Sequence, residues 1–328
     1  MHVRAFSSAA PSRRHGHRLA RALALTGALA VGTGSLGTGA AAVFTGSAGT
    51  AGAAVQRSAS ARATAHGSGP VDVLYAGSLV TLMQTSLDAA FHRATGYTVT
   101  GISAGSTALA SEIKGGVRVA DVFVSAASRS DVALEGRANG NWVSWYATVA
   151  TSPLLLGYNP SSAFAAALRS KPWWSVVTRP GFQVGRTNPV TDPKGVLTVK
   201  AVDETANKEH DPRLRSIVAT TADVFPEQAM VGRLQSGQLD AGFFYGVEAA
   251  AAKLPTVPLK GVDLHAVFTV TVVAHAPHPA GADAFVRFLL GAEGRSLLDK
   301  NGMRGLAHPE VRGKRSAVPK GLQKAFGR

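Results

Sequence analysis

The sequence predicts an α/β fold built from two lobes, and three observations support this prediction. Short apolar segments typical of buried strands alternate with helical patterns from about residue 70 onwards. Two of the strand-to-helix junctions are near-copies of one another. Two further apolar, extended segments, 142–158 and 265–274, are interpreted as the connections from the first lobe to the second and back. Two such crossings imply a hinge and a cleft.

The composition is that of a folded protein with an unusual basic excess. The 328 residues are 45% hydrophobic and 16% charged, so the chain can bury a substantial core. The formal net charge is +14, but residues 1–70 hold seven basic residues and no acidic one, and without them it is +7. No nucleic-acid motif or aromatic-interleaved basic stripe is present. We therefore expect no nucleic-acid partner.

The N-terminal 42 residues have the pattern of an export signal. A basic region ends at Arg21, an apolar run follows over 22–31, and small residues surround Ala40-Ala41-Ala42. The apolar run is about half the length that crossing a bilayer requires. Cysteine is absent, which excludes disulfides, thiolate ligands and a lipid-modified cysteine from this sequence. We expect an exported protein at the periplasmic or extracellular face of the cell membrane.

The two similar junctions are candidates for an anion site. They are Ala76-Gly77-Ser78 and Ala104-Gly105-Ser106, 28 positions apart, each between an apolar run and a helical pattern. Helix N-termini offer unpaired N–H groups and partial positive charge. An ordinary serine N-cap explains either junction alone. A third apolar run, 119–126, ends at Ser125 and Ala126, and ligands of open α/β sheets bind at such strand ends.

The second lobe is expected to place three further side chains near the cleft. Asp192 precedes Pro193 as a helix N-cap, and Glu227 lies in the first turn of a helix over 225–236. Capping and the helix dipole explain both acids without a function. Tyr245 ends a buried strand over 239–245. The second lobe is also expected to contain helix 162–170, strand 183–185 and helix 247–253. Two amphipathic helices, 280–290 and 293–301, then return the chain to lobe one.

The order of these motifs resembles that of the periplasmic molybdate/tungstate-binding proteins of ABC importers, most closely the tungstate-type branch. The resemblance covers roughly residues 70–305. It is carried by Ala76-Gly-Ser-Leu79, Ala104-Gly-Ser106, Ala120-Asp-Val-Phe-Val-Ser125, Asn188-Pro-Val-Thr-Asp-Pro-Lys-Gly195, Glu227, Ser236-Gly-Gln-Leu-Asp-Ala-Gly-Phe-Phe-Tyr245 and Ala284-Phe-Val-Arg-Phe-Leu-Leu290 followed by Gly294. It implies a two-lobe periplasmic-binding-protein (Venus flytrap, type II) fold with two hinge crossings and no enzyme activity.

The resemblance also implies a ligand, partners and a set of site residues. A tetrahedral oxyanion, molybdate or tungstate, would bind in the cleft without any further cofactor, and an ABC permease and ATPase would receive it from the monomer. Sulfate and phosphate offer no open coordination position, so carboxylates beside them would be repulsive. Oxygen ligands do suit a hard, high-valent metal. The implied contacts are hydroxyls of Ser78, Ser106 and Tyr245, a backbone N–H near Ala126, and carboxylates of Asp192 and Glu227 on the metal itself.

The expected organisation of the chain has five parts. They are a signal peptide (1–42), a flexible linker (43–69), lobe one (70–150 plus 265–310), lobe two (151–264) and a basic tail (311–328), with the chain beyond His308 loosely held. One residue departs from the family pattern. Lys194 follows Asp192-Pro193 where a small or neutral residue is expected. Its charge either alters the choice of ligand or points into solvent.

Two alternatives remain open from the sequence. Gly101-Ile-Ser-Ala-Gly105 matches the nucleophile elbow of α/β-hydrolases, which would make the protein a serine esterase with Ser103 as nucleophile. Asp240 with His265 or His275 would complete its triad. So short a motif often occurs by chance. The other alternative is a binding protein of the same fold for another solute.

Overall fold

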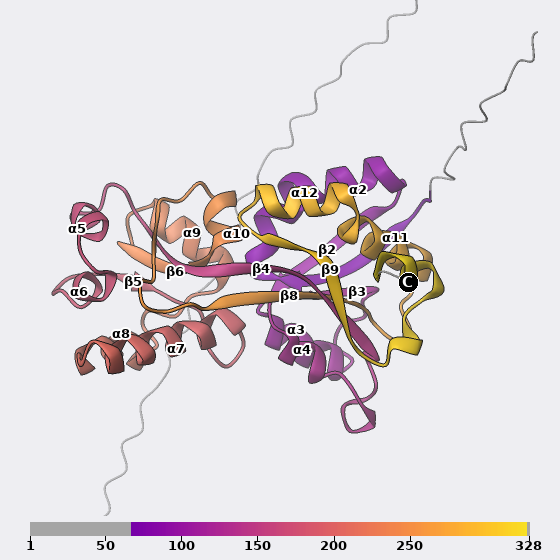
Figure 1. Ribbon diagram of the computed structural model, residues 1–328, viewed down its shortest axis with the longest axis horizontal. Helices are drawn as coiled ribbons and strands as arrows, with labels where there is room; N and C mark the ends of the chain where they lie inside the picture. Colours follow the sequence, from indigo (N-terminus) through magenta and orange to yellow (C-terminus); the bar gives the residue numbers. More distant parts are fainter. Residues whose placement is uncertain (1–66, 327–328) are drawn as a thin grey trace, which may run out of the picture. The chain divides into compact units, whose positions relative to one another are not determined.

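The computed structural model describes residues 67–326 (Figure 1). The predicted signal peptide and nearly all of the predicted linker lie outside these residues. The strands are β1 (Pro70–Ala76), β2 (Thr98–Ala104), β3 (Val122–Ser125), β4 (Trp145–Tyr158), β5 (Val184–Gly185), β6 (Ala241–Tyr245), β7 (Thr256–Pro258), β8 (His265–Val272) and β9 (Arg304–Gly313). The helices are α1 (Val80–Leu82), α2 (Asp88–Thr95), α3 (Ser106–Lys114), α4 (Ser128–Val132), α5 (Ala165–Ser170), α6 (Trp173–Val177), α7 (Pro193–Lys208), α8 (Ser216–Ala219), α9 (Glu227–Gln235), α10 (Gly246–Ala251), α11 (Pro279–Leu290), α12 (Ala292–Lys300) and α13 (Lys320–Gln323).

Strand β4 connects two groups of strands. The strand order is β2-β1-β3-β8-β4-β6-β5, and β7 and β9 also pair with β4. Strands β1, β2 and β3 are parallel, and β8 joins them antiparallel to β3. The first part of β4 pairs with β8 and β9, and its second part pairs with β6 and β7. Pro153, which has no N–H to donate to a strand partner, lies where β4 leaves β8 and meets β6.

The predicted α/β class with two crossing segments is confirmed. The segments 142–158 and 265–274 correspond to β4 and β8, which run antiparallel beside each other at the centre of the strand order (Figure 1). Strands alternate with helices before the first crossing and again between the two crossings. The lobe boundaries proposed from the sequence remain predictions.

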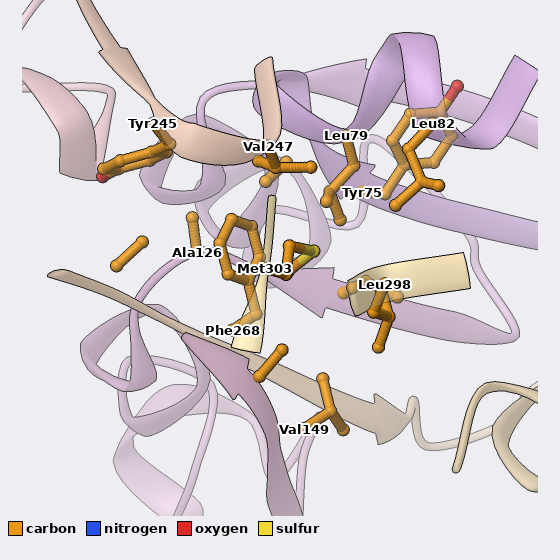
Figure 2. Packing of buried hydrophobic residues seen from close by; sticks show 14 of the residues in the cluster. Tyr75, Leu79, Leu82, Ala126, Val149, Tyr245, Val247, Phe268, Leu298 and Met303 are labelled. Atoms are coloured by element: carbon orange, nitrogen blue, oxygen red, sulfur yellow. The ribbon is translucent and has the colours of Figure 1, made fainter. Parts of the chain in front are cut away.

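A buried apolar cluster runs through the strands and the helices that cover them. Figure 2 shows part of it: Val149 of β4 and Phe268 of β8 lie close to Leu298 of α12 and Met303. Phe91 of α2 makes edge-to-face ring contacts with two phenylalanines of α11, 5.3 and 5.7 Å between centroids. The Trp173-Trp174 pair is also packing, since Trp173 is 2% exposed and contacts Phe243 of β6.

The C-terminal segment is more firmly held than the sequence analysis expected. Strand β9 continues to Gly313 and pairs with β4, and Val311, Val318 and Leu322 are buried. The expectation of a loose chain beyond His308 was wrong because three apolar side chains, widely spaced among basic ones, find places in the core. Among residues 67–326, no helix has the length and apolar character that a bilayer crossing demands.

Candidate ligand-binding site

Three parallel strands end at one edge of the sheet, and each end carries a predicted site residue. Ala76 of β1 pairs with Ala104 of β2, and β1 also pairs with β3, whose last residue is Ser125. The register therefore brings Ser78, Ser106 and Ala126 to the same edge. The Gly77–Leu79 turn and the start of α3 point their N-termini there, as the two similar sequence junctions predicted.

Ser106 and Ala126 are in direct contact. The Ala126 N–H donates to Ser106 Oγ at 3.0 Å, and Ser106 is fully buried as the first residue of α3. Because Ser106 Oγ accepts this bond, its own hydroxyl proton is left to donate elsewhere. The Ala126 N–H, in contrast, is already occupied in this structure.

Two other predicted hydroxyls are buried without a hydrogen-bond partner. Among the described residues, neither Ser78 Oγ nor Tyr245 Oη has one. Ser78 is 3% exposed and Tyr245 is fully buried, with its ring packed edge-on against Phe268 (Figure 2). The turn that carries Ser78 contacts both α9 and α10, the helix that begins directly after Tyr245. A buried hydroxyl without a partner calls for an explanation, and a bound ligand or an ordered water is one.

The loop before α7 positions Asp192 as its N-cap. Asp192 Oδ1 accepts the Lys194 N–H at 2.7 Å, and the Asp192 N–H bonds to the Asn188 carbonyl. Gly195 permits this fold-back: a Cβ there would lie 2.6 Å from backbone atoms of 187–189. The capping role expected from the sequence is thus real, yet Asp192 also lines a cavity.

Two glycines just after the strand ends let residues of the other strand group approach the backbone. A Cβ on Gly77 would lie 2.1 Å from Glu227 Oε2, and one on Gly105 would lie 2.3 Å from the Thr191 carbonyl oxygen. The Ala108 N–H donates to that same Thr191 carbonyl at 3.1 Å. Side chains at either glycine would hold the two groups of residues apart.

A cavity of about 370 Å³ opens between these groups. From the side of β2 and α3 it is lined by Ser103, Ala104, Gly105 and Ala108, and from the other side by Thr187, Asn188, Thr191, Asp192 and Val224–Gln228. Asp192 and Glu227 therefore face a common space. A second cavity of about 210 Å³ joins Ala126 to Pro193 at the start of α7.

Lys194 is part of this site and does not point into solvent. It is fully buried, and its Nζ lies 2.6 Å from Glu248 Oε1 and 3.1 Å from Glu227 Oε1. Glu248 Oε2 in turn accepts the Tyr245 N–H at 2.9 Å. One ammonium thus links acidic side chains of α9 and α10 to the capped end of α7.

Burial controls the protonation of these groups. It raises the pKa of Tyr245 well above its ordinary value, and the charges of Asp192 and Glu227 raise it further, so the phenol remains an O–H donor. Burial also raises the pKa values of Asp192, Glu227 and Glu248, against the lowering effect of Lys194. Burial alone would lower the pKa of Lys194, but Glu227, Glu248 and Asp192 outweigh it and raise that pKa.

The sequence analysis did not select Glu248 or Thr187. Glu248 stands three residues after Tyr245 at the start of a helix, the spacing of a capping box, and that signal could have identified it. Thr187 lines the cavity with a buried hydroxyl that has no partner among residues 67–326. A threonine in a loop carries no comparable signal.

The esterase triad is not assembled. Ser103 Oγ accepts a hydrogen bond from Gln228 Nε2 at 3.1 Å, which ties β2 to α9 across the cavity. The Asp240 carboxylate accepts from Ser162 and from the Gln183 N–H, and His265 lies beside Asp263. Within the described chain, neither histidine contacts Ser103 or Asp240. The side chains that the triad would need are therefore engaged with other partners in this structure.

Known proteins resemble this chain over most of its folded part. The family described as bacterial extracellular solute-binding protein matches residues 71–304. An uncharacterized solute-binding protein of Petrotoga mobilis is 25% identical over 282 residues, 74% of this chain and 86% of the relative. The molybdate/tungstate-binding protein WtpA of Pyrococcus abyssi is 22% identical over 237 residues, 56% of this chain and 68% of the relative.

Solved structures show the same fold. The periplasmic molybdate-binding protein of Azotobacter vinelandii superposes with a TM-score of 0.56 at 20% identity, covering 71% of this chain and 98% of its own. The family match over residues 71–304 includes both crossing strands, β4 and β8, and all of the candidate site residues. The protein is a member of the bacterial extracellular solute-binding protein family.

Proposed function

We propose that this protein captures a tetrahedral oxyanion, molybdate or tungstate, for an ABC importer. The observation that carries the proposal is the pair of buried hydroxyls of Ser78 and Tyr245, from the two strand groups, neither of which has a partner within the described chain. Oxyanion oxygens accept hydrogen bonds, and O–H groups held out of water donate strong ones to an anion.

Three hydroxyls would donate to the anion. Ser78 and Tyr245 have no other partner in the part of the chain described, and Ser106 has its proton free because its oxygen accepts the Ala126 N–H. The raised pKa of Tyr245 keeps that phenol protonated. Ala126 would thus act through Ser106, by orienting the serine hydroxyl.

The carboxylates of Asp192 and Glu227 would contact the metal atom. A carboxylate cannot donate to an oxyanion unless protonated, so beside sulfate it would be repulsive. Molybdenum and tungsten accept additional oxygen ligands, which makes the pair useful for these two anions. The similarity to WtpA, whose name records molybdate and tungstate, supports this choice.

The remaining expectations concern the protein's place in transport. We propose that it is exported, acts as a monomer and delivers its ligand to a permease with a separate ATPase. The sequence has no phosphate-binding loop of the G-x-x-x-x-G-K-[ST] kind, so ATP hydrolysis would belong to the partner.

Thermal unfolding of the purified, ligand-stripped protein tests the proposal. Molybdate, tungstate, sulfate and phosphate are compared, each at several concentrations. A ligand at hundredfold excess over its dissociation constant stabilises the folded state by about 2.7 kcal/mol. We expect molybdate and tungstate to raise the melting temperature more than sulfate or phosphate does. If no oxyanion raises it, the proposed function is wrong.

The variant Glu227→Gln examines the carboxylate role. It keeps the shape of the side chain and removes a strong ligand for the metal. Affinity for molybdate and tungstate should fall, while any weak binding of sulfate should be unchanged or improved because a repulsive charge is gone. If the variant binds molybdate, tungstate and sulfate with the same affinities as the unmodified protein, Glu227 does not contact the metal.

A further inference from the structure

Lys194 places a positive charge where solvent cannot screen it. Its side chain is fully buried, and both carboxylates that it contacts, Glu227 and Glu248, are nearly so. Its Nζ also lies 5.8 Å from the centre of the Tyr245 ring. The other buried cation among residues 67–326, Arg186, donates to the carbonyls of Val218 and Thr220, so it is engaged elsewhere.

The site would be strongly acidic without this lysine. Asp192, Glu227 and Glu248 are each about 6% exposed. The charges of Asp192 and Glu248 raise the pKa of Glu227, and that of Asp192 also raises the pKa of Glu248. A dianion brought beside three carboxylates meets repulsion that a poorly screened environment strengthens. Arg129 also acts on Asp192 and Tyr245 through its charge, but Lys194 is the cation that pairs directly with two of the three acids. Its ammonium is therefore the largest opposing charge within the acidic cluster.

We propose that Lys194 is the specificity-determining residue of this site and that its ammonium makes the cleft selective for dianions. The inference rests on the proposed function, because it takes the oxyanion to bind beside Asp192 and Glu227. Lys194 is not one of the hydrogen-bonding groups assigned to the ligand. It contributes the opposing charge that those acidic side chains require.

The contacts of Lys194 connect it to every part of the lobe-two half of the site. Its backbone N–H bonds to Asp192 and its Nζ pairs with Glu227. Through Glu248 it also reaches the backbone N–H of Tyr245. A buried lysine that only satisfied its acidic neighbours would stabilise the fold without distinguishing ligands by charge. Selectivity between anions of one shape and different charge separates the two roles.

Tungstate and perrhenate provide that comparison, since both are tetrahedral MO₄ ions of similar size with charges of −2 and −1. Their affinities are measured by isothermal titration calorimetry on the full chain. In Lys194→Met we expect tungstate affinity to fall about a hundredfold and perrhenate affinity about tenfold, because the Coulomb energy of an ammonium with a dianion is twice that with a monoanion. The tungstate-to-perrhenate ratio therefore falls about tenfold.

Glu248→Gln removes a negative charge from the site, where Lys194→Met removes a positive one. It tests the same proposal if Lys194→Met does not fold. The single glutamine oxygen can accept either the Lys194 ammonium or the Tyr245 N–H, and one negative charge is gone. The tungstate-to-perrhenate ratio should rise, by about threefold or more. Lys200→Met, on the exposed face of the same helix, is the matched control and should leave the ratio unchanged.

The outcomes separate the two proposals. If the unmodified protein binds neither tungstate nor molybdate, the proposed function fails and this inference fails with it. If it binds tungstate and the folded variants keep its tungstate-to-perrhenate ratio, the role of Lys194 is overturned while the function stands. Should Lys194→Met not fold, the direction of change in Glu248→Gln decides alone.

Discussion

Ser78 and Tyr245 each bury a hydroxyl that has no hydrogen-bond partner in the described part of the chain. Such groups lower the stability of the ligand-free protein. A buried polar group without a partner costs about 1–3 kcal/mol. Neither hydroxyl has a partner among the described residues, although both are at most 3% exposed. Both residues lie at or just after strand ends, and neither lines the cavity of Asp192 and Glu227 in this structure. A ligand that accepted hydrogen bonds from the two hydroxyls would offset this cost.

This argument predicts opposite effects of Ser78→Ala on stability and on binding. Removing the unpaired hydroxyl should leave the free energy of unfolding of the ligand-free protein unchanged or raise it by about 1 kcal/mol. Oxyanion affinity should fall about tenfold to a hundredfold, since a donor to a charged ligand contributes about 1.5–3 kcal/mol. Urea unfolding and calorimetric titration measure the two quantities.

Ser130→Ala is the matched control. Ser130, in α4, is also buried with a hydroxyl that has no partner among the described residues, but it lines a different cavity, with Thr107 and Lys114. Its removal should affect stability in the same direction and leave affinity unchanged. If Ser78→Ala binds the oxyanion as tightly as the unmodified protein, Ser78 does not contact the ligand.

Lys194 shows the limit of sequence analysis for a single residue. A lysine in the first turn of a helix is normally solvated, and the sequence left open whether this one reached the cleft or the solvent. Its carboxylate partners come from 33 and 54 positions further along the chain. Only packing of three helix N-termini around one point removes it from water.

At the scale of elements, the site depends on strand and helix ends that approach without side chains between them. Gly105 has φ of −58°, a value open to any residue, so the restriction there comes from contact alone. A Cβ would lie 2.3 Å from the Thr191 carbonyl and 3.1 Å from Asp192 Cα. Glycine therefore permits the close approach in which the Ala108 N–H donates to the Thr191 carbonyl.

Gly105→Ala should weaken ligand binding about tenfold or more while leaving the fold intact. The methyl group separates α3 from the loop before α7, and a displacement of about 1 Å disrupts several hydrogen bonds to a ligand. Titration calorimetry gives the affinity, and circular dichroism checks the fold.

Gly232→Ala, in the middle of α9, provides the comparison for that change. A Cβ at position 232 meets nothing within 4 Å, so alanine should stabilise the helix by up to about 1 kcal/mol without altering affinity. If Gly105→Ala bound the ligand as well as Gly232→Ala does, close approach at Gly105 would not matter for binding.

At the scale of the whole molecule, Asp131 joins β3 to β8 beneath the site. Its carboxylate accepts hydrogen bonds from Ser125 of β3 and Thr269 of β8, 2.9 and 2.6 Å long. Burial raises the pKa of Asp131 to about 7, and the nearby charge of Glu135 raises it slightly more. The protonated acid is therefore the form that folding favours.

Stability should consequently fall between about pH 4 and pH 7. The folded pKa lies above the unfolded one, so the contribution is complete below the unfolded pKa and is lost as pH rises through about 7. Asp131→Asn keeps the accepting oxygen and cannot ionise. It should be more stable than the unmodified protein at pH 8, by up to about 4 kcal/mol, and differ little from it at pH 4.

Urea unfolding at a series of pH values between 4 and 8 measures this difference. Asp263→Asn is the control, because Asp263 is 94% exposed on its side chain and should leave the pH dependence as it is. An unchanged slope in Asp131→Asn would assign the pH dependence to another group.

The sequence by itself determined the local features: alternating strands and helices, the two Ala-Gly-Ser junctions, the capping role of Asp192 and the two crossing segments. These follow from apolar periodicity and backbone preference, which act between near neighbours. Tertiary structure alone decided that Ser78 and Tyr245 lack hydrogen-bond partners among residues 67–326, that Ser103 bonds to Gln228, and that the C-terminal segment packs on β4. It also buried Lys194 among distant carboxylates. Burial and charge at a site are sums over residues far apart in the chain, so no local pattern records them.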